Sequence, residues 1–192
     1  EHNPGGPSGV PSDSAAIALT GGHLNFYGSG AITAPITGDA ASTVEFYGAI
    51  TTVNLSGGVR VGLSGGTLYD GTITLEPGGT LHVDSNGTLS NLTLNGDLDL
   101  TQYDGAIVTV ANGLTLNGTA YAGASDGSRH GGMDFSGTQT LQGTGTVVFG
   151  PHAYKRLLIA QPGTAGALGP RLSVYGGGRG LARLVVVRPF AY

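Results

Sequence analysis

The chain has 192 residues, of which 39% are apolar and only 10% charged, with 37 glycines, one methionine and neither cysteine nor tryptophan. Without cysteine, a disulfide framework, a thiolate nucleophile and a thiolate metal site are all excluded, and no apolar run is long enough to span a membrane. Abundant Gly, Thr, Val and Leu favour many short strands joined by tight turns.

The net charge of −4 is unevenly distributed along the chain. The part up to Asp134 holds all 12 acidic residues and two basic ones, Arg60 and Arg129, which gives −10. The part after Asp134 holds six basic residues and no acidic residue, which gives +6. We therefore expect the two ends of the molecule to attract each other.

The N-terminal segment, residues 1–22, is predicted to be a Gly/Pro-rich tail and entry segment, because the prolines and glycines of residues 3–9 disfavour a helix and a central strand. Between His23 and Gly150, short runs with period-two alternation are separated by Gly or Asn-Gly and predict short strands. These runs are Leu24–Phe26, Val44–Phe46, Val59–Val61, Leu81–Val83, Leu98–Leu100 and Val108–Val110. The Gly-, Ser- and Asp-rich segment Ala122–Gly132 predicts a protruding loop.

Internal repetition is the strongest signal in the sequence. Residues 26–28 recur at 46–48, residues 66–70 at 87–91, and residues 92–96 at 114–118, with offsets of 20, 21 and 22. A unit of this length with two or three strands predicts one coil of a single-stranded parallel β-helix, with coils stacked about 4.8 Å apart. About six coils fit into residues 23–150.

The alternation also predicts which side chains point inward. Leu, Ile, Val and Phe are expected to form apolar ladders inside the solenoid, while Thr and Asn face outward or occupy corners. The ladder positions include Ile73, Leu75, Leu92, Leu94, Leu114 and Leu116.

Two stretches, GTLSNLTLNGDL at 87–98 and FSGTQTLQGTGTV at 135–147, resemble the degenerate repeats of large bacterial surface β-helix proteins. The related proteins are filamentous-haemagglutinin-like adhesins and autotransporter passengers, and the likeness covers roughly residues 65–150. The resemblance implies a secreted or surface-bound right-handed β-helix that serves adhesion or scaffolding. It carries over no catalytic residue.

Residues 151–192 differ in composition and are predicted to form a basic C-terminal β segment that acts as a cap or a subunit-coupling element. Strands are expected at 156–160, 172–175 and 184–187, separated by turns. Basic and apolar side chains in this segment are the candidates for self-association. They are Arg156, Arg171, Arg179, Arg183, Leu184, Val185, Val186, Val187 and Arg188.

Catalytic and metal-binding alternatives are weaker. Asp97 and Asp99 lie on one face of a strand and could flank a glycosidic bond, but alternation with leucines already explains them as solvated outward positions. Asp126 and His130 share the predicted loop and could form a small polar or metal site, yet the five histidines lack metal-ligand spacing. We therefore predict no catalytic residue, no cofactor and no metal site.

Three threonines, Thr72, Thr93 and Thr115, fall at one position of successive coils and could form a flat rank of hydroxyls like that of ice-binding solenoids. Too few coils share the position, and threonine favours outward strand positions in any case. The basic C-terminal segment could contact phosphates, but the acidic remainder of the chain repels polyanions, so no nucleic-acid partner is predicted.

The ends of a β-helix expose unpaired backbone groups, which soluble proteins protect with charges or prolines. This chain has one lysine and three glutamates for that purpose, so we expect its ends to pair with other copies. Head-to-tail contacts of this kind propagate into filaments. The sequence thus predicts a secreted, non-enzymatic structural subunit of an extracellular filament or surface matrix whose partners are copies of itself. A surface adhesin or a glycan-binding module is the alternative, and a polysaccharide lyase or hydrolase is the weakest candidate.

Overall fold

The computed structural model describes residues 16–51, 55–76, 79–158, 166–176 and 183–185. These residues form 21 strands and no helix, which confirms the all-β prediction. Of the predicted N-terminal segment, residues 1–15 lie outside the described residues.

The strands belong to three sheets. The first three turns pass through sheets A, B and C in that order, and the later turns pass between sheets B and C. Sheet A contains β1 (Ile17–Leu19), β4 (Ile36–Gly38) and β7 (Leu55–Gly57). Sheet B contains β2 (His23–Phe26), β5 (Thr43–Phe46), β8 (Arg60–Leu63), β10 (Thr80–Val83), β12 (Asp97–Leu100), β14 (Thr119–Ala122), β17 (Thr146–Phe149) and β20 (Ser173–Gly176). Sheet C contains β3 (Gly30–Ala31), β6 (Ala49–Thr51), β9 (Thr67–Thr74), β11 (Asn86–Asn95), β13 (Ala106–Leu116), β15 (Gly131–Ser136), β16 (Gln139–Gln142), β18 (Arg156–Leu158), β19 (Gly166–Leu168) and β21 (Arg183–Val185).

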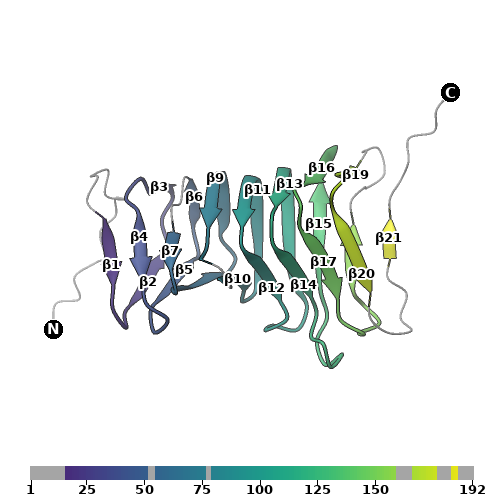
Figure 1. The fold of residues 1–192 in the computed structure, drawn as a ribbon, viewed down its shortest axis with the longest axis horizontal. Coiled ribbons are helices and arrows are strands. Elements are labelled where there is room, and N and C mark those ends of the chain that lie inside the picture. The colour runs from purple at the N-terminus through teal and green to yellow at the C-terminus, as the bar shows by residue number, and fades with distance from the viewer. Residues whose placement is uncertain (1–15, 52–54, 77–78, 159–165, 177–182, 186–192) are drawn as a thin grey trace.

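The chain winds as a parallel β-solenoid along a single axis (Figure 1). The eight strands of sheet B, from β2 to β20, correspond to about seven turns, which roughly matches the six predicted between His23 and Gly150. The β-helix prediction is therefore confirmed.

The sequence repeats correspond to the pairing register of neighbouring turns. Phe26 lies opposite Phe46, and Leu92 lies opposite Leu114, because equivalent positions of successive turns stack directly on each other. Turn length nevertheless varies, from 17 residues between Val44 and Val61 to 27 between Ala120 and Val147. The 27-residue turn between Ala120 and Val147 contains the predicted loop, which connects β14 to β15 and extends beyond the sheets in Figure 1.

The six predicted inward residues are all buried. Ile73, Leu94 and Leu116 are 0% exposed, and Leu75, Leu92 and Leu114 are at most 6% exposed. Burying a leucine or isoleucine side chain contributes about 1.5–3 kcal/mol, so these ladders stabilise the stacking of the turns.

Polar residues at one corner bend the long strands of sheet C. Asp70, Asn91 and Asn112 have φ values of 54°, 48° and 55°, a left-handed conformation that Asn and Asp tolerate better than most residues. Asn91 Nδ2 donates a hydrogen bond to Asp70 Oδ1 at 2.8 Å, and Asn112 Nδ2 donates to Ser90 Oγ at 3.0 Å. These contacts link the corners of successive turns.

The same sheets continue into the basic C-terminal segment that we predicted to begin at residue 151. There β17 pairs with β20, and β18 pairs with β21, all in parallel. The strands predicted near 156, 172 and 184 are thus present as β18, β20 and β21. Towards the N-terminus, β1 lies inside the predicted entry segment and pairs with β4.

Candidate functional site

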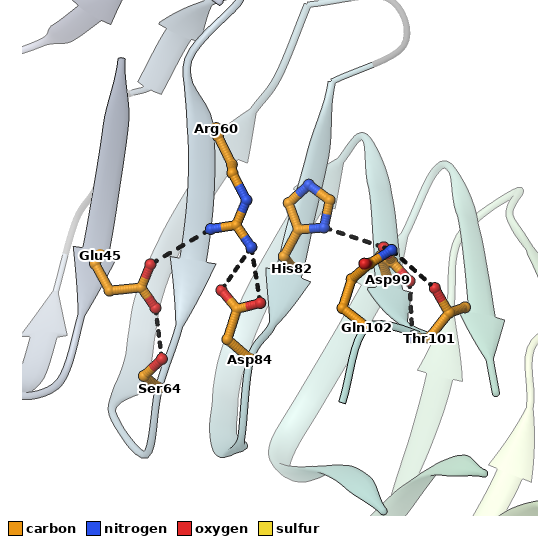
Figure 2. A network of polar contacts seen from close by, with 8 residues as sticks. All are labelled: Glu45, Arg60, Ser64, His82, Asp84, Asp99, Thr101 and Gln102. Carbon is orange, nitrogen blue, oxygen red and sulfur yellow. Dashed lines mark hydrogen bonds and ion pairs between the residues drawn. The ribbon is translucent and has the colours of Figure 1, made fainter. Parts of the chain in front are cut away.

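The outer face of sheet B carries a network of polar side chains that crosses several turns (Figure 2). Arg60 donates to both carboxylate oxygens of Asp84, at 2.7 and 2.8 Å, and its other terminal nitrogen lies 3.6 Å from Glu45. Glu45 is only 7% exposed and accepts a hydrogen bond from Ser64 Oγ at 2.5 Å. Its carboxylate lies directly over Gly62, where an added Cβ would lie 2.0 Å from an oxygen. The missing side chain of Gly62 is therefore what makes room for this ion pair.

A second group of polar contacts in Figure 2 is centred on the carboxylate of Asp99, which lies on β12. It is 8% exposed, so the prediction of a solvated position was wrong. The side chain does point outward, but it accepts hydrogen bonds from His82 Nδ1 at 3.0 Å, Thr101 N at 2.8 Å and Gln102 Nε2 at 3.1 Å. A neighbour on the previous turn and two in the following bend cover it, which strand alternation alone does not reveal.

These contacts shift the pKa of Asp99. Burial is the largest single influence and acts to raise it, but the hydrogen bonds from His82, Thr101 and Gln102 together outweigh burial and hold the pKa well below its usual range. Its strand neighbour Asp97 accepts the backbone N–H of Thr119 on the next turn at 2.7 Å. Both carboxylates therefore join elements of the solenoid.

A groove of about 830 Å³ opens on the same face, beside Asp99. Its floor includes Asp99, Tyr121 and Val148, which lie opposite one another on β12, β14 and β17. Its wall is the loop that follows β14. The groove is lined by Thr80, Asp99, Thr101, Tyr121, Gly123, Ala124, Ser125, Asp126, Ser128, Arg129, Val148, Phe149, Gly150 and Pro151. The sequence predicted the loop but not the groove.

The loop residues Asp126 and His130, considered together as a polar or metal site, have separate partners. Asp126 accepts hydrogen bonds from Ser128 N and Oγ at 2.9 and 2.7 Å. Of these, the Ser128 side-chain bond lowers the pKa of Asp126 most. His130 instead contacts Asp104, through its backbone N–H at 3.0 Å and Nδ1 at 2.8 Å. Among the described residues, no group of three His, Asp or Glu side chains is placed to hold a metal ion.

His130 also belongs to an aromatic stack at the edge of the solenoid. Its ring lies 5.2 Å from that of His152, which lies 5.5 Å from that of Tyr154. The carboxylate of Asp104 contacts the His130 ring at one end of this stack. Its pKa is lowered, chiefly because it accepts the backbone N–H of His130. This cluster joins three consecutive turns. It was not predicted, because His130 lies 26 residues after Asp104 and 22 before His152, and these positions follow no repeat.

Exposed tyrosines gather on one side of the solenoid. Every exposed large hydrophobic side chain among the described residues is a tyrosine, and each lies in sheet B or in the bend that follows it. They are Tyr27, Tyr47, Tyr103, Tyr121, Tyr154 and Tyr175. Rings on neighbouring turns can stack, as Tyr27 and Tyr47 do at 4.7 Å. The repeat of residues 26–28 at 46–48 is the sequence signal for that pair.

Five of the nine predicted self-association residues belong to the described part of the chain, and they lie towards its C-terminal end. Arg156 forms an ion pair with Asp134 of the preceding turn, with Nε 2.6 Å from Oδ1, so its charge has a partner within its own chain. Arg171 is exposed in the bend before β20. Arg183, Leu184 and Val185 form β21, which lies beside β18. Arg179, Val186, Val187 and Arg188 lie outside the described residues.

The first and last described turns are less well enclosed than the middle ones. At the N-terminal end, Ile17, Leu19, Leu24 and Phe26 pack against the core but are only partly buried, and at the other end the same holds for Leu168, Leu172 and Val174. By contrast, Val44 and Phe46, one turn further in, are 0% exposed.

The threonine rank is aligned as predicted, since Thr72, Thr93 and Thr115 lie opposite one another, and Gln142 continues the row. Three hydroxyls followed by an amide form only a short row. Threonine is common at outward strand positions, so the row needs no ice-binding role to explain it.

No protein-family model, curated protein or solved structure matches the chain. Within the described part of the chain, no helix is long and apolar enough to cross a membrane.

Proposed function

We propose that this chain is a non-enzymatic structural subunit that associates end to end with copies of itself in an extracellular filament or surface matrix. The observation that supports the proposal is the partial exposure of apolar ladder residues at both ends of the described solenoid. Stacking the first turn of one copy on the last turn of another would bury these residues. The turn spacing of about 4.8 Å would then continue across the junction.

The backbone of β2 favours such stacking. Gly22 O and Phe26 O accept hydrogen bonds from Thr43 N and Tyr47 N of the second turn, at 2.9 and 2.8 Å. Because successive peptide groups of a parallel strand alternate in direction, the N–H and C=O groups of His23 and Asn25 point the other way, towards the position of a preceding turn. The strand contains no proline, lysine or carboxylate that would protect this edge.

The two ends are chemically different, which favours a head-to-tail contact. Acidic residues are confined to the part of the chain up to Asp134 and basic residues dominate the rest, so unlike ends attract while like ends repel. A head-to-tail contact between identical subunits leaves a free end on each side and therefore builds a filament unless the rotation closes a ring.

Sedimentation velocity over a concentration series, with negative-stain imaging of the same samples, tests this proposal on the full chain. We expect linear oligomers that lengthen with concentration. Asn25→Pro removes an N–H that faces away from the second turn, so it should block assembly while leaving the thermal unfolding temperature nearly unchanged. Asn25→Ala, which keeps the N–H, is the matched control and should assemble normally. A wild-type chain that stays monomeric at every concentration would refute the proposal.

A further inference from the structure

One row of side chains on the outer face of sheet B runs along the solenoid axis through the groove and beyond it. Asp99, Tyr121, Val148 and Tyr175 lie opposite one another on β12, β14, β17 and β20. Tyr121 and Tyr175 are 40% and 61% exposed. Because neighbouring parallel strands are about 4.8 Å apart, the two tyrosines are separated by roughly 10 Å. Val148 lies between them and completes a flat, mostly apolar strip.

The wall beside this strip is an internally hydrogen-bonded loop. Gly123 N donates to Leu100 O at 3.2 Å, Ala124 N donates to Arg129 O at 3.0 Å, and Gly127 N donates to Ala124 O at 3.0 Å. These bonds anchor the loop to the solenoid and close it on itself. The groove between loop and strip, about 830 Å³, lies within the range of volumes of ligand sites in proteins.

The polar groups of the groove are suited to a ligand rich in hydroxyls. Hydroxyl side chains line it from the strand side and from the loop, among them Thr80, Ser125 and Ser128. Arg129 donates to Thr101 O at 3.3 Å, which uses one of the five N–H donors that a guanidinium carries. The other donors and the Ser125 hydroxyl are the groups available to hold ligand oxygens, whereas the Ser128 hydroxyl donates to Asp126.

The charge of the groove restricts the ligand further. Its lining includes two carboxylates, Asp99 and Asp126, and one guanidinium, Arg129. The low pKa of each carboxyl group keeps it ionised at neutral pH. The lining is therefore net negative, and it repels an anionic ligand such as a nucleic acid or a uronic acid polymer.

We propose that this groove and strip bind a neutral, extended polysaccharide strand that lies parallel to the solenoid axis. The spacing of one turn is close to the length of one hexose unit in an extended chain. Sugar rings two units apart would therefore stack on Tyr121 and Tyr175, while Arg129 and the loop hydroxyls bind the sugar hydroxyls. The proposal does not require end-to-end assembly. Tyr175 lies on β20, the last strand of sheet B, but Tyr121, Arg129 and the loop lie one or more turns further in.

Isothermal titration calorimetry of the full chain with defined hexasaccharides tests this site. The probes are cellohexaose, xylohexaose and mannohexaose as neutral extended chains, maltohexaose as a neutral helical chain, and hexagalacturonate as an anionic chain. We expect at least one extended neutral chain to bind more tightly than maltohexaose and hexagalacturonate. Tyr121→Ala and Tyr175→Ala should each weaken that binding about tenfold.

The matched control is Tyr27→Ala, because Tyr27 is an exposed tyrosine at the edge of the same sheet but far from the groove. It should bind as the wild type does. Tyr121→Phe keeps the ring and should retain most of the affinity, which separates ring stacking from loss of fold. The proposal is overturned if no extended neutral hexasaccharide binds at millimolar concentration, if hexagalacturonate binds best, or if Tyr121→Ala and Tyr27→Ala have equal effects.

Discussion

Replacing the buried carboxylate Asp99 with alanine tests whether the polar network stabilises the solenoid. Asp99 accepts three hydrogen bonds, at 2.8, 3.0 and 3.1 Å. A hydrogen bond to a charged group contributes about 1.5–3 kcal/mol, so the simple sum is roughly 5–9 kcal/mol. The side chains of His82 and Gln102 reach water once released, whereas the Thr101 N–H is fixed by the backbone. We therefore expect Asp99→Ala to lower the free energy of unfolding by about 2–4 kcal/mol.

The assay is equilibrium urea unfolding at pH 7, analysed by linear extrapolation. Asp97→Ala is the matched control, since Asp97 lies on the same strand and accepts one backbone hydrogen bond from the next turn. Its single hydrogen bond is also to a carboxylate but is less buried, so the substitution should cost about 1.5 kcal/mol, the lower end of the same range. Equal losses in the two variants would show that the three contacts of Asp99 contribute no more than the single contact of Asp97, and would refute the reasoning.

The lowered pKa of Asp99 also predicts how its contribution depends on pH. A carboxylate whose pKa is lower in the folded state stabilises the fold fully above its unfolded pKa, which is about 3.9. That contribution is lost as the pH falls through this value towards the folded pKa. The difference in unfolding free energy between the wild type and Asp99→Asn should therefore shrink below about pH 4. A difference that stays constant from pH 7 to pH 3 would contradict the assignment.

Two further substitutions test the packing of the turns by urea unfolding. Leu94→Ala removes a fully buried side chain from the inner ladder and should cost about 3–5 kcal/mol; a loss below 1 kcal/mol would mean that the ladder is not tightly packed. Gly48→Ala places a Cβ 1.8 Å from the carbonyl oxygen of Gly28 in the adjacent turn, so it should destabilise the fold by more than 3 kcal/mol or prevent folding. Gly65→Ala is its control, because no atom lies within 4 Å of the added Cβ, and only the φ of +79° opposes it, at a cost of about 1–2 kcal/mol.

The sequence could not predict the candidate sites on the outer face, because they depend on how far the turns differ in length. Arg60 reaches Asp84 across 24 residues, and His130 reaches Asp104 across 26, whereas the repeats have offsets of 20 to 22. Outward side chains of neighbouring turns are not constrained to be alike, so no repeat marks their contacts. The burial of Asp99 was missed for the same reason, since two of its three partners come from the bend after its own strand and one from the previous turn.

What the sequence alone determined is the solenoid and its interior. In a parallel stack each turn covers the one before it, so an apolar position recurs at nearly the same interval, and Leu92 and Leu114 are recognisable as neighbours before any coordinates are known. The outer face was decided only by the tertiary structure. The eight residues between β14 and β15 fold into a wall, and that wall turns an otherwise regular row of strand residues into a groove.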